Sequence, residues 1–503
     1  MTYPPLQGIK LVLITLALSL AVFMEVLDST IANVAVPVIA GDLGAAATQG
    51  TWVITSFAVA NAVSIPLTGF MARRFGEVRL FVGAIIGFVI TSWLCGMSHN
   101  LETLVLFRIL QGLLAGPMIP LSQSLLMACY PPEKRTLALA LWAMTVVVAP
   151  IFGPILGGWI SDNWHWGWIF FINIPIGIAA AFATWRILKD RETETFRSPI
   201  DKTGLVLLVF GVGALQMMLD RGKELDWFAS TEIIVFAVVA VVCLAYFVVW
   251  ELGEAHPIVD LTLFKDRNFT VGVITVSLGF MVYMGTLVLL TMVLQTQLGY
   301  TATWAGLAAA PVGILPVLLS PVIGRFGGRL DMRILVTVSF TVFAACFLWR
   351  TEFYAGMDFG SVLWPQFWQG LGVAMFFMPL TTIILSHMPG HMVAAASSLS
   401  NFLRVLAGGV GTSVATTLWE RREALHHSRL AENINPYSDT ALTALNGMVQ
   451  TGMSQEQAYA GLAGSISRQG FIISSNEIFW VGALLFLALI ALVWLAKPPF
   501  AGR

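Results

Sequence analysis

Charged side chains are scarce in this sequence. Asp, Glu, Lys and Arg make up 11% of the 503 residues, whereas a soluble domain carries about 25%. Hydrophobic residues make up 57%, and the mean hydropathy is +0.82. The composition therefore excludes an ordinary soluble domain and predicts a protein embedded in membrane lipid. The formal net charge of −1 argues against a nucleic-acid partner.

Cysteine and histidine are also few. The four cysteines show no paired spacing, which argues against a disulfide framework and a zinc site. The seven histidines include His426-His427, but none has ligand spacing on a helix face. The sequence lacks the Gly-rich loop with Lys-Ser/Thr that binds ATP phosphates, which disfavours an ATP-driven pump. We expect no metal and no cofactor.

Long apolar runs are abundant. A run of about 20 residues crosses the apolar core of a bilayer as a helix, and we count fourteen such runs between short charged or turn-rich stretches. The predicted spans are 11–36, 51–71, 79–98, 102–128, 137–160, 167–187, 203–220, 231–251, 270–292, 304–324, 333–350, 361–385, 391–418 and 471–496. The predicted fold class is an all-α polytopic membrane protein.

The basic residues predict the orientation, because short loops rich in Lys and Arg stay in the cytoplasm. With the N-terminus inside, most Lys and Arg fall in cytoplasmic segments, and the short outer loops hold only Arg221, Lys223 and Arg350. Both termini are therefore expected to face the cytoplasm. The first apolar run is too long for a signal-peptide core, so we expect it to be a retained helix.

Weak internal repeats suggest two related halves. Four short matches recur in the same order at offsets of 251 to 259 residues. They are Thr51-Trp52 with Thr303-Trp304, Arg74-Phe75-Gly76 with Arg325-Phe326-Gly327, Gln111-Gly112 with Gln369-Gly370, and Pro120-Leu121 with Pro379-Leu380. We expect an N-terminal six-helix bundle at 1–190, two additional transmembrane helices with cytoplasmic linkers at 191–259, and a C-terminal six-helix bundle at 260–503 with a long periplasmic loop at about 419–470.

Asp28 lies well inside the first apolar segment. A carboxylate at membrane depth is a functional candidate by default, because burying it in lipid is costly. Glu25 lies one turn earlier on the same helix face, and Asn33 follows. These three side chains need partners inside the bundle.

Arg108 is the matching cation, about two turns inside the fourth span. An arginine there must be paired, hydrated or able to extend to the interface, and Gln111 lies one turn further on. The repeat places Gln366 at the position equivalent to Arg108. The charge is therefore absent from the second half.

The turn between spans two and three contains Gly69, Arg73, Arg74 and Gly76. Glycine allows a tight reversal, and arginines interact favourably with helix C-termini and acidic partners. The turn is expected either to hold one conformation of the two halves closed or only to anchor the loop in the cytoplasm.

The fifth span carries small residues and two prolines. Ala149, Gly153 and Gly157 recur every four residues and permit close approach of another backbone, while Pro150 and Pro154 remove helix hydrogen bonds. The residues alone leave open whether this pattern serves packing or motion.

Asn401 and Arg404 share a face of span thirteen. Both a place in the cavity wall and interhelical hydrogen bonding remain open for them. The candidate substrate-cavity residues are Asn33, Gln111, Gln123, Asn401 and Arg404.

The polar segment from about Trp419 to Gln469 is the one sizeable region expected outside the membrane. Asn435-Pro436 predicts a turn, and the sequence from Ser454 to Gln457 predicts a capping box that opens a short helix. A docking surface and a solvated linker are the two interpretations of this loop.

The motifs around Asp28, at the Gly69–Arg79 turn, at Arg108 and at Ala149–Gly158 resemble those of the fourteen-helix drug:proton antiporters of the major facilitator superfamily. The chain is similar to EmrB-type multidrug exporters over nearly its full length, and the fifth-span motif is the most specific match. Arg73 stands where many members have Asp. The resemblance implies two six-helix halves with two extra central helices.

For function, the resemblance implies proton-coupled efflux of small hydrophobic drugs from the bacterial inner membrane. Proton coupling would involve Asp28, Glu25 and Arg108, with a periplasmic membrane-fusion adaptor protein and an outer-membrane channel as partners. The alternative is a proton-coupled symporter or facilitator of a polar solute, whose cavity would hold more hydrogen-bonding groups. A membrane enzyme ranks third, since no nucleophile and base are arranged for catalysis.

Overall fold

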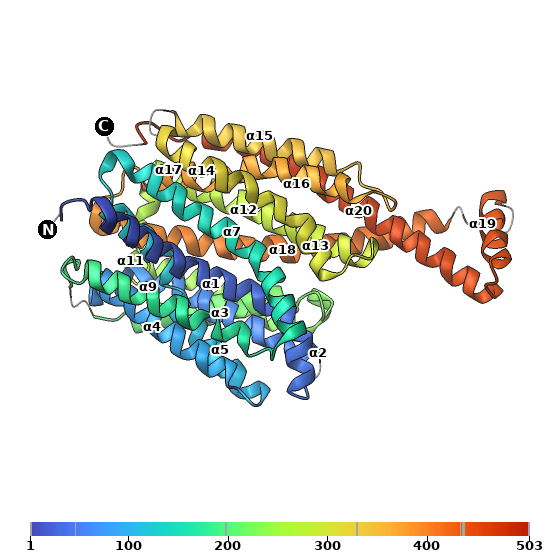
Figure 1. Ribbon diagram of the computed structural model, residues 1–503, viewed down its shortest axis with the longest axis horizontal. Coiled ribbons are helices and arrows are strands. Elements are labelled where there is room, and N and C mark those ends of the chain that lie inside the picture. The colour runs from blue at the N-terminus through green and yellow to red at the C-terminus, as the bar shows by residue number, and fades with distance from the viewer. Residues whose placement is uncertain are drawn as a thin grey trace.

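The computed structural model describes residues 3–500, apart from positions 46, 197, 198, 328, 329, 433 and 435–437. Over these residues it consists of helices and turns and contains no strand. Fourteen helical segments are long and apolar enough to cross a membrane, which confirms the predicted all-α polytopic class. The chain begins and ends at the same end of the bundle (Figure 1), as an even number of crossings requires. We call this the terminal end.

The first six crossings are built from nine helices. These are α1 (Gly8–Asp42), α2 (Ala47–Gly50), α3 (Trp52–Phe75), α4 (Glu77–Gly96), α5 (Leu101–Ala115), α6 (Met118–Cys129), α7 (Arg135–Asn163), α8 (Trp168–Phe171) and α9 (Asn173–Leu188). Two further crossings follow, α10 (Lys202–Arg221) and α11 (Thr231–Gly253), which pack against each other. Helix α10 also packs against α3.

The remaining crossings begin with α12 (Arg267–Met292), which continues into the π-helical turn η4 (Val293–Gln297). The helices after it are α13 (Ala302–Ala309), α14 (Ile314–Gly327), α15 (Met332–Arg350), α16 (Phe359–Ala374), α17 (Phe377–Leu385), α18 (Val393–Ala431), α19 (Asp439–Gln450) and α20 (Gln455–Val493). Short 3₁₀ turns join several helices along the whole chain: η1 (Pro132–Lys134), η2 (Trp227–Ala229), η3 (Leu261–Lys265), η5 (Ala310–Gly313) and η6 (Gly390–Met392).

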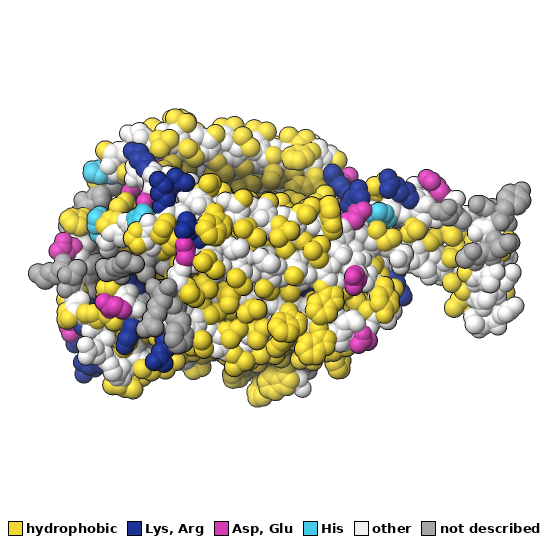
Figure 2. Space-filling model, turned by 90° about the horizontal axis from the view of Figure 1, so that it is seen from above, with side chains coloured by type: hydrophobic (Ala, Val, Ile, Leu, Met, Phe, Trp, Pro, Cys, Tyr) yellow, Lys and Arg dark blue, Asp and Glu magenta, His cyan; other side chains and the backbone are white. Residues whose placement is uncertain are grey.

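Hydrophobic side chains cover the middle of the molecule, whereas charged side chains lie mostly toward its two ends (Figure 2). An uncharged belt between charged ends is the surface that a bilayer requires, because burying a charge in hydrocarbon is costly. The exposed faces of α10 and α11 contribute Val206, Phe210, Val238 and Val241 to this surface. These residues are therefore expected to contact lipid.

Several predicted spans are interrupted in the structure, among them 102–128 and 361–385. Helix α5 ends at Ala115 and α6 begins at Met118, and α16 ends at Ala374 and α17 begins at Phe377. A proline has no N–H to donate to the carbonyl four residues earlier. Pro120 and Pro379 therefore leave the carbonyls of Gly116 and Met375 without that bond, and both breaks lie there. Because the two prolines are repeat partners, the breaks recur at matching places.

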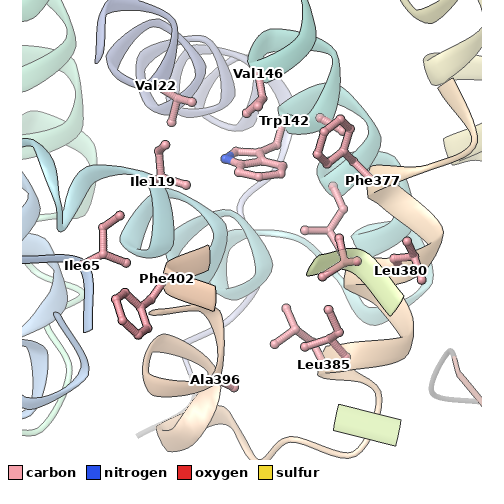
Figure 3. Close-up of a cluster of buried hydrophobic side chains, with 14 of the residues drawn as sticks. Val22, Ile65, Ile119, Trp142, Val146, Phe377, Leu380, Leu385, Ala396 and Phe402 are labelled. Carbon is pink, nitrogen blue, oxygen red and sulfur yellow. The ribbon is translucent and has the colours of Figure 1, made fainter. Parts of the chain in front are cut away.

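Helices from the two ends of the chain meet in one hydrophobic core. Figure 3 shows Trp142 of α7 beside Phe377 of α17, with Ile65 of α3 and Phe402 of α18 also in view. All of these side chains are buried. The core that joins the early and late helices is therefore apolar side-chain packing.

Close contacts that involve the backbone join the same two sets of helices at the terminal end. A Cβ at Gly69 in α3 would lie 2.9 Å from Ala395 Cα in α18. Ser398 Oγ donates to the carbonyl oxygen of Ile65 at 2.5 Å. Thr136 Oγ1 in α7 donates to Gly324 O in α14 at 3.0 Å. The structure therefore has the early and late helices closed against each other at the terminal end.

Helices α18 and α20 are 39 residues each. At 1.5 Å per residue each is about 58 Å long, nearly twice the roughly 30 Å apolar core of a bilayer. They extend beyond the bundle and carry α19 at the far tip (Figure 1). Arg422 of α18 and Glu477 of α20 form two hydrogen bonds of 2.7 Å at the base of this extension.

The predicted short helix after Ser454 is therefore wrong in length. The capping box of Ser454 and Gln457 is present, but the helix that it opens is α20, which continues to Val493 as the last crossing. Neither α18 nor α20 contains a proline, so nothing removes a backbone donor where each leaves the membrane. The predicted turn at Asn435-Pro436 lies outside the described residues.

The small residues of α7 pack against α1. A Cβ at Gly153 would collide with the side chain of Thr30, and a Cβ at Gly157 would lie 2.8 Å from the carbonyl oxygen of Ile31. Ala149 is fully buried. The expected close approach is therefore to α1, one helical turn beyond Asp28.

Gly157→Leu should destabilise the protein, because the added side chain has no space between α7 and α1. Overpacking of this kind costs about 1–3 kcal/mol, and we expect a lower melting temperature in thermal unfolding of the purified protein. Gly83→Leu is the matched control, since nothing lies within 4 Å of a Cβ at Gly83 in α4. Equal melting temperatures of the two variants would contradict a tight α1–α7 contact.

Candidate functional site

Asp28 of α1 and Arg108 of α5 form a buried ion pair. Arg108 Nη1 donates to Asp28 Oδ2 at 2.6 Å, and both residues are 0% exposed. The Arg108 guanidinium also donates through Nε to the carbonyl oxygen of Val53 at 3.0 Å. It lies 4.1 Å from the centre of the Phe57 ring, within cation–π range. Residues Val53 and Phe57 belong to α3.

Amide side chains complete the surroundings of the pair. Gln111 Nε2 donates to Asp28 Oδ1 at 3.2 Å, and Asn173 Nδ2 of α9 donates to the same oxygen at 2.7 Å. Gln111 Oε1 accepts a second bond of 2.7 Å from Arg108 Nη1. Asn173 Nδ2 also donates to Ser92 Oγ of α4 at 3.0 Å. The carboxylate thus accepts three hydrogen bonds, from Arg108, Gln111 and Asn173.

The geometry of this ion pair depends on the charge of Asp28. A buried ion pair is tolerated only when its remaining donors and acceptors are satisfied, and removal of one partner is strongly destabilising. Asp28 meets that condition while it is ionised. Protonation would remove the charge that holds Arg108, so the hydrogen bonds among α1, α3, α5 and α9 would have to change.

Asn173 and Ser92 were not among the predicted site residues. Asn173 is the first residue of α9 and follows the apolar run of α8. An amide inside an apolar span, two residues before Pro175, was a usable signal, since such groups need a partner in the bundle. Ser92 gave no comparable signal, because serine is common in packed membrane helices.

Glu25 lies apart from the ion pair. It is 2% exposed, and Asn61 of α3 hydrogen-bonds its carboxyl group. Its Oε2 atom has no hydrogen-bond partner among the described residues. Asp28 and Arg404 are the charged residues that act on it electrostatically. Glu25 is therefore a buried acid between the ion pair and α18.

A narrow pocket lies between the early and late helices. Its polar wall contains Gln123 of α6 and Ser397, Ser400, Asn401 and Arg404 of α18. Asn401 Nδ2 donates to Gln123 Oε1 at 2.8 Å, and Arg404 Nη2 donates to Asn401 Oδ1 at 2.7 Å. Its other wall is formed by Trp142, Val276, Phe377, Thr381, Ile384 and Leu385.

The candidate cavity residues thus separate into two places. Gln123, Asn401 and Arg404 line the pocket, whereas Gln111 bonds Asp28 and Arg108. Asn33 lies in α1, and its side chain is outside the described residues. Of the three proton-coupling candidates, Asp28 and Arg108 are in contact and Glu25 is separate.

The turn after α3 is fixed by an acid that the sequence analysis did not select. Gly76 has φ of +90°, a conformation that favours glycine. Glu192 accepts hydrogen bonds from the backbone N–H groups of Val78 at 3.0 Å and Arg79 at 2.9 Å, at the start of α4. A Cβ at Gly76 would collide with that carboxylate.

The remaining motif residues lie near the terminal end or in α7. Arg73 Nη2 donates to the carbonyl oxygen of Pro257 at 3.4 Å. Arg74 lies 6.0 Å from the ring centre of Phe75. Pro150 lies within α7 and is half-buried. Pro154 belongs to the same helix, but its side chain is outside the described residues.

Arg350 is not the loop residue that the sequence analysis expected. It is the last residue of α15, 1% exposed, and its guanidinium donates to Gln369. The sequence placed it at a span boundary, where an exposed side chain was the simpler expectation. Its guanidinium lies 5.2 Å from the Phe347 ring centre, so aromatic side chains replace the expected solvent.

The sequence pattern of the Major Facilitator Superfamily matches residues 18–412. The fatty acid resistance protein FarB of Neisseria gonorrhoeae is 71% identical, over 99% of both chains. The multidrug export protein EmrB of Escherichia coli K12 is 61% identical, over 99% of this chain and 97% of its own.

Among solved structures, the proton:xylose symporter XylE aligns with a TM-score of 0.60 over 96% of this chain and 95% of its own. The two sequences are 12% identical, so this likeness shows the fold alone. Together, the matched pattern and the full-length identity to multidrug export proteins place this chain in the major facilitator superfamily, among its EmrB-type multidrug exporters.

Proposed function

We propose that this multidrug exporter moves hydrophobic compounds out of the cell in exchange for protons, and that Asp28 carries the proton. The single observation that supports this proposal best is the ion pair of Asp28 and Arg108, fully buried at membrane depth. An intramembrane carboxylate paired with a cation is typical of proton pathways in transporters. The amides of Gln111 and Asn173 stabilise the ionised form.

The exchange uses alternating access of the two halves. When the site opens outward, a proton neutralises Asp28 and weakens its bond to Arg108. The halves then rock, Asp28 releases the proton to the cytoplasm and pairs with Arg108 again, and a drug enters the pocket. The next change of access carries the drug outward. Proton and drug occupy different residues and are linked through α1, which carries Asp28 and packs against α3, α7 and α9.

The same proposal places the protein in the bacterial inner membrane with both termini in the cytoplasm. Arg73 and Arg74 lie in the last turn of α3 at the terminal end. At the same end, Lys134 ends the turn η1 and Arg135 begins α7. Basic residues in short loops mark the cytoplasmic side. In this orientation α19 and the ends of α18 and α20 project into the periplasm.

Substrates are expected to be small hydrophobic compounds, including fatty acids. One relative at 71% identity is named for resistance to fatty acids, and another at 61% for multidrug export. The apolar wall of the pocket, with Trp142, Phe377 and Leu385, suits apolar groups of varied shape. The apolar wall of the pocket and the names of these relatives thus favour an exporter over a symporter of a polar solute.

Asp28→Asn should abolish efflux driven by a pH gradient, because the amide cannot take up and release a proton. Drug binding at equilibrium should persist, since Asp28 does not line the pocket. The measurement is drug efflux from proteoliposomes with and without the gradient. Unchanged gradient-driven efflux by this variant would refute the assignment of Asp28.

A second variant separates coupling from stability. Asp28→Asn alone leaves Arg108 buried without its anion, and breaking such a pair costs about 3–5 kcal/mol. Asp28→Asn combined with Arg108→Gln removes both charges and should regain much of the lost melting temperature. Coupling should stay lost in the double variant, whereas a purely structural role predicts that it returns.

Closure at the terminal end is expected to depend on Gly69. Gly69→Leu would force α3 and α18 apart, because even a Cβ lies 2.9 Å from Ala395 Cα. We expect slower transport and stronger labelling of a Ser400→Cys reporter from the cytoplasmic side. Gly83→Leu is again the control and should alternate normally. Unchanged labelling in Gly69→Leu would contradict a gating contact at this glycine.

We further propose that the projecting helices α18, α19 and α20 dock a periplasmic adaptor protein, which connects to an outer-membrane channel. Leu442 and Val449 are exposed on α19, seven residues apart and hence on one face. Exposed apolar side chains at a rigid helical tip suit a protein partner. A solvated extension would be expected to carry polar residues there.

Leu442→Glu with Val449→Glu should remove drug resistance in cells but leave gradient-driven efflux in proteoliposomes unchanged. The charges would oppose burial of this face against the adaptor, while α19 lies far from the ion pair. Thr443→Glu, exposed on the next face of α19, is the matched control. Full resistance with the double change would argue against docking through α19.

A further inference from the structure

Arg404 is a buried cation that faces the pocket with most of its donors unused. It lies on α18, is 5% exposed and lines the pocket. Among the described residues, its one hydrogen bond runs to Asn401 Oδ1 at 2.7 Å, although a guanidinium has five N–H donors. The Phe280 and Phe377 ring centres lie 5.0 Å and 5.4 Å from it.

Within the described part of the chain, Arg404 lacks the carboxylate partner that Arg108 has. Arg108 has a carboxylate oxygen at 2.6 Å, whereas Arg404 forms no direct ion pair with any described residue and interacts with Glu25 only at longer range. A buried charge without an anion in contact costs several kcal/mol. An anion that enters the pocket would therefore find a cation already desolvated and oriented.

The pocket also offers a second free polar group and an apolar wall. Ser397 is 1% exposed and lines the pocket, and its Oγ atom has no hydrogen-bond partner among the described residues. Opposite this polar side lie Trp142, Ile384 and Leu385. A charged group at one end and an apolar tail at the other would match the two walls.

We propose that Arg404 binds the carboxylate of an anionic amphiphile, with Ser397 and Asn401 beside it and the apolar tail along α7 and α17. This proposal rests on the proposed export function and identifies the residue of its pocket that binds the acidic group of such a substrate. The substrate enters when the two halves separate, because the pocket is narrow while the halves are in contact.

The test is equilibrium binding of two matched probes, dodecanoate and dodecanol, to the purified full-length protein without any proton gradient. The probes share a tail and differ in the carboxylate. A hydrogen-bonded charge contributes about 1.5–3 kcal/mol, which corresponds to roughly 10- to 100-fold in affinity. Arg404→Gln should weaken dodecanoate by that factor and leave dodecanol nearly unchanged. Arg404→Lys should retain part of the dodecanoate affinity.

Arg350→Gln is the control for loss of a buried arginine, since Arg350 lies in α15 outside the pocket lining. It should leave both affinities unchanged. If Arg404→Gln weakens both probes equally, the carboxylate site is wrong.

These outcomes are distinct from failure of the proposed function. Binding without a gradient reports only on the pocket, whereas gradient-driven efflux by Asp28→Asn reports on coupling. Loss of the carboxylate preference with intact proton-driven export would overturn this inference alone.

Discussion

The arrangement of the early helices depends on one constraint, the burial of an ionised Asp28 in a medium with little water. A charge at this depth must be paired, and the pair must have its other hydrogen bonds satisfied. Arg108, Gln111 and Asn173 meet this requirement from α5 and α9, and Val53 of α3 accepts from the arginine. A single carboxylate thus fixes the relative positions of four helices. A change in its charge therefore alters hydrogen bonds that involve all four.

Among the described residues, the late helices repeat the backbone of this arrangement without its ion pair. Pro379 breaks its span at the place where Pro120 breaks the fourth, so the backbone geometry is shared. Gln366 stands where Arg108 would be, and Arg350 reaches Gln369 from a neighbouring helix, with aromatic rings instead of a carboxylate around it. The repeat therefore maintains the packing in both halves. The ion pair of Asp28 and Arg108, and the buried acid Glu25, belong to the first half.

The sequence predicted the features that depend on a single helix. Fourteen apolar runs, the depth of Asp28 and Arg108, and the capping box at Ser454 all follow from composition and local spacing. It did not identify Asn173 as a partner of Asp28, because that pairing joins residues 145 positions apart. It also placed Gln111 in the cavity, since helical spacing gives a side chain's face but not which neighbour covers that face. The length of α20 was missed because hydropathy records where the apolar stretch begins, whereas the helix continues as long as no residue breaks it.

Helix α1 is the element through which the ion pair and the pocket are connected. Asp28 faces Arg108, Glu25 lies one turn away and interacts with Arg404, and the residues after Asp28 pack on Gly153 and Gly157 of α7. Because the α1–α7 contact leaves no space for even a methyl group, the two helices must move together. Helix α7 also carries Trp142 in the pocket and Thr136 in the contact with α14. A shift of α1 on protonation of Asp28 would therefore be transmitted by direct packing both to the pocket and to the contact that closes the terminal end.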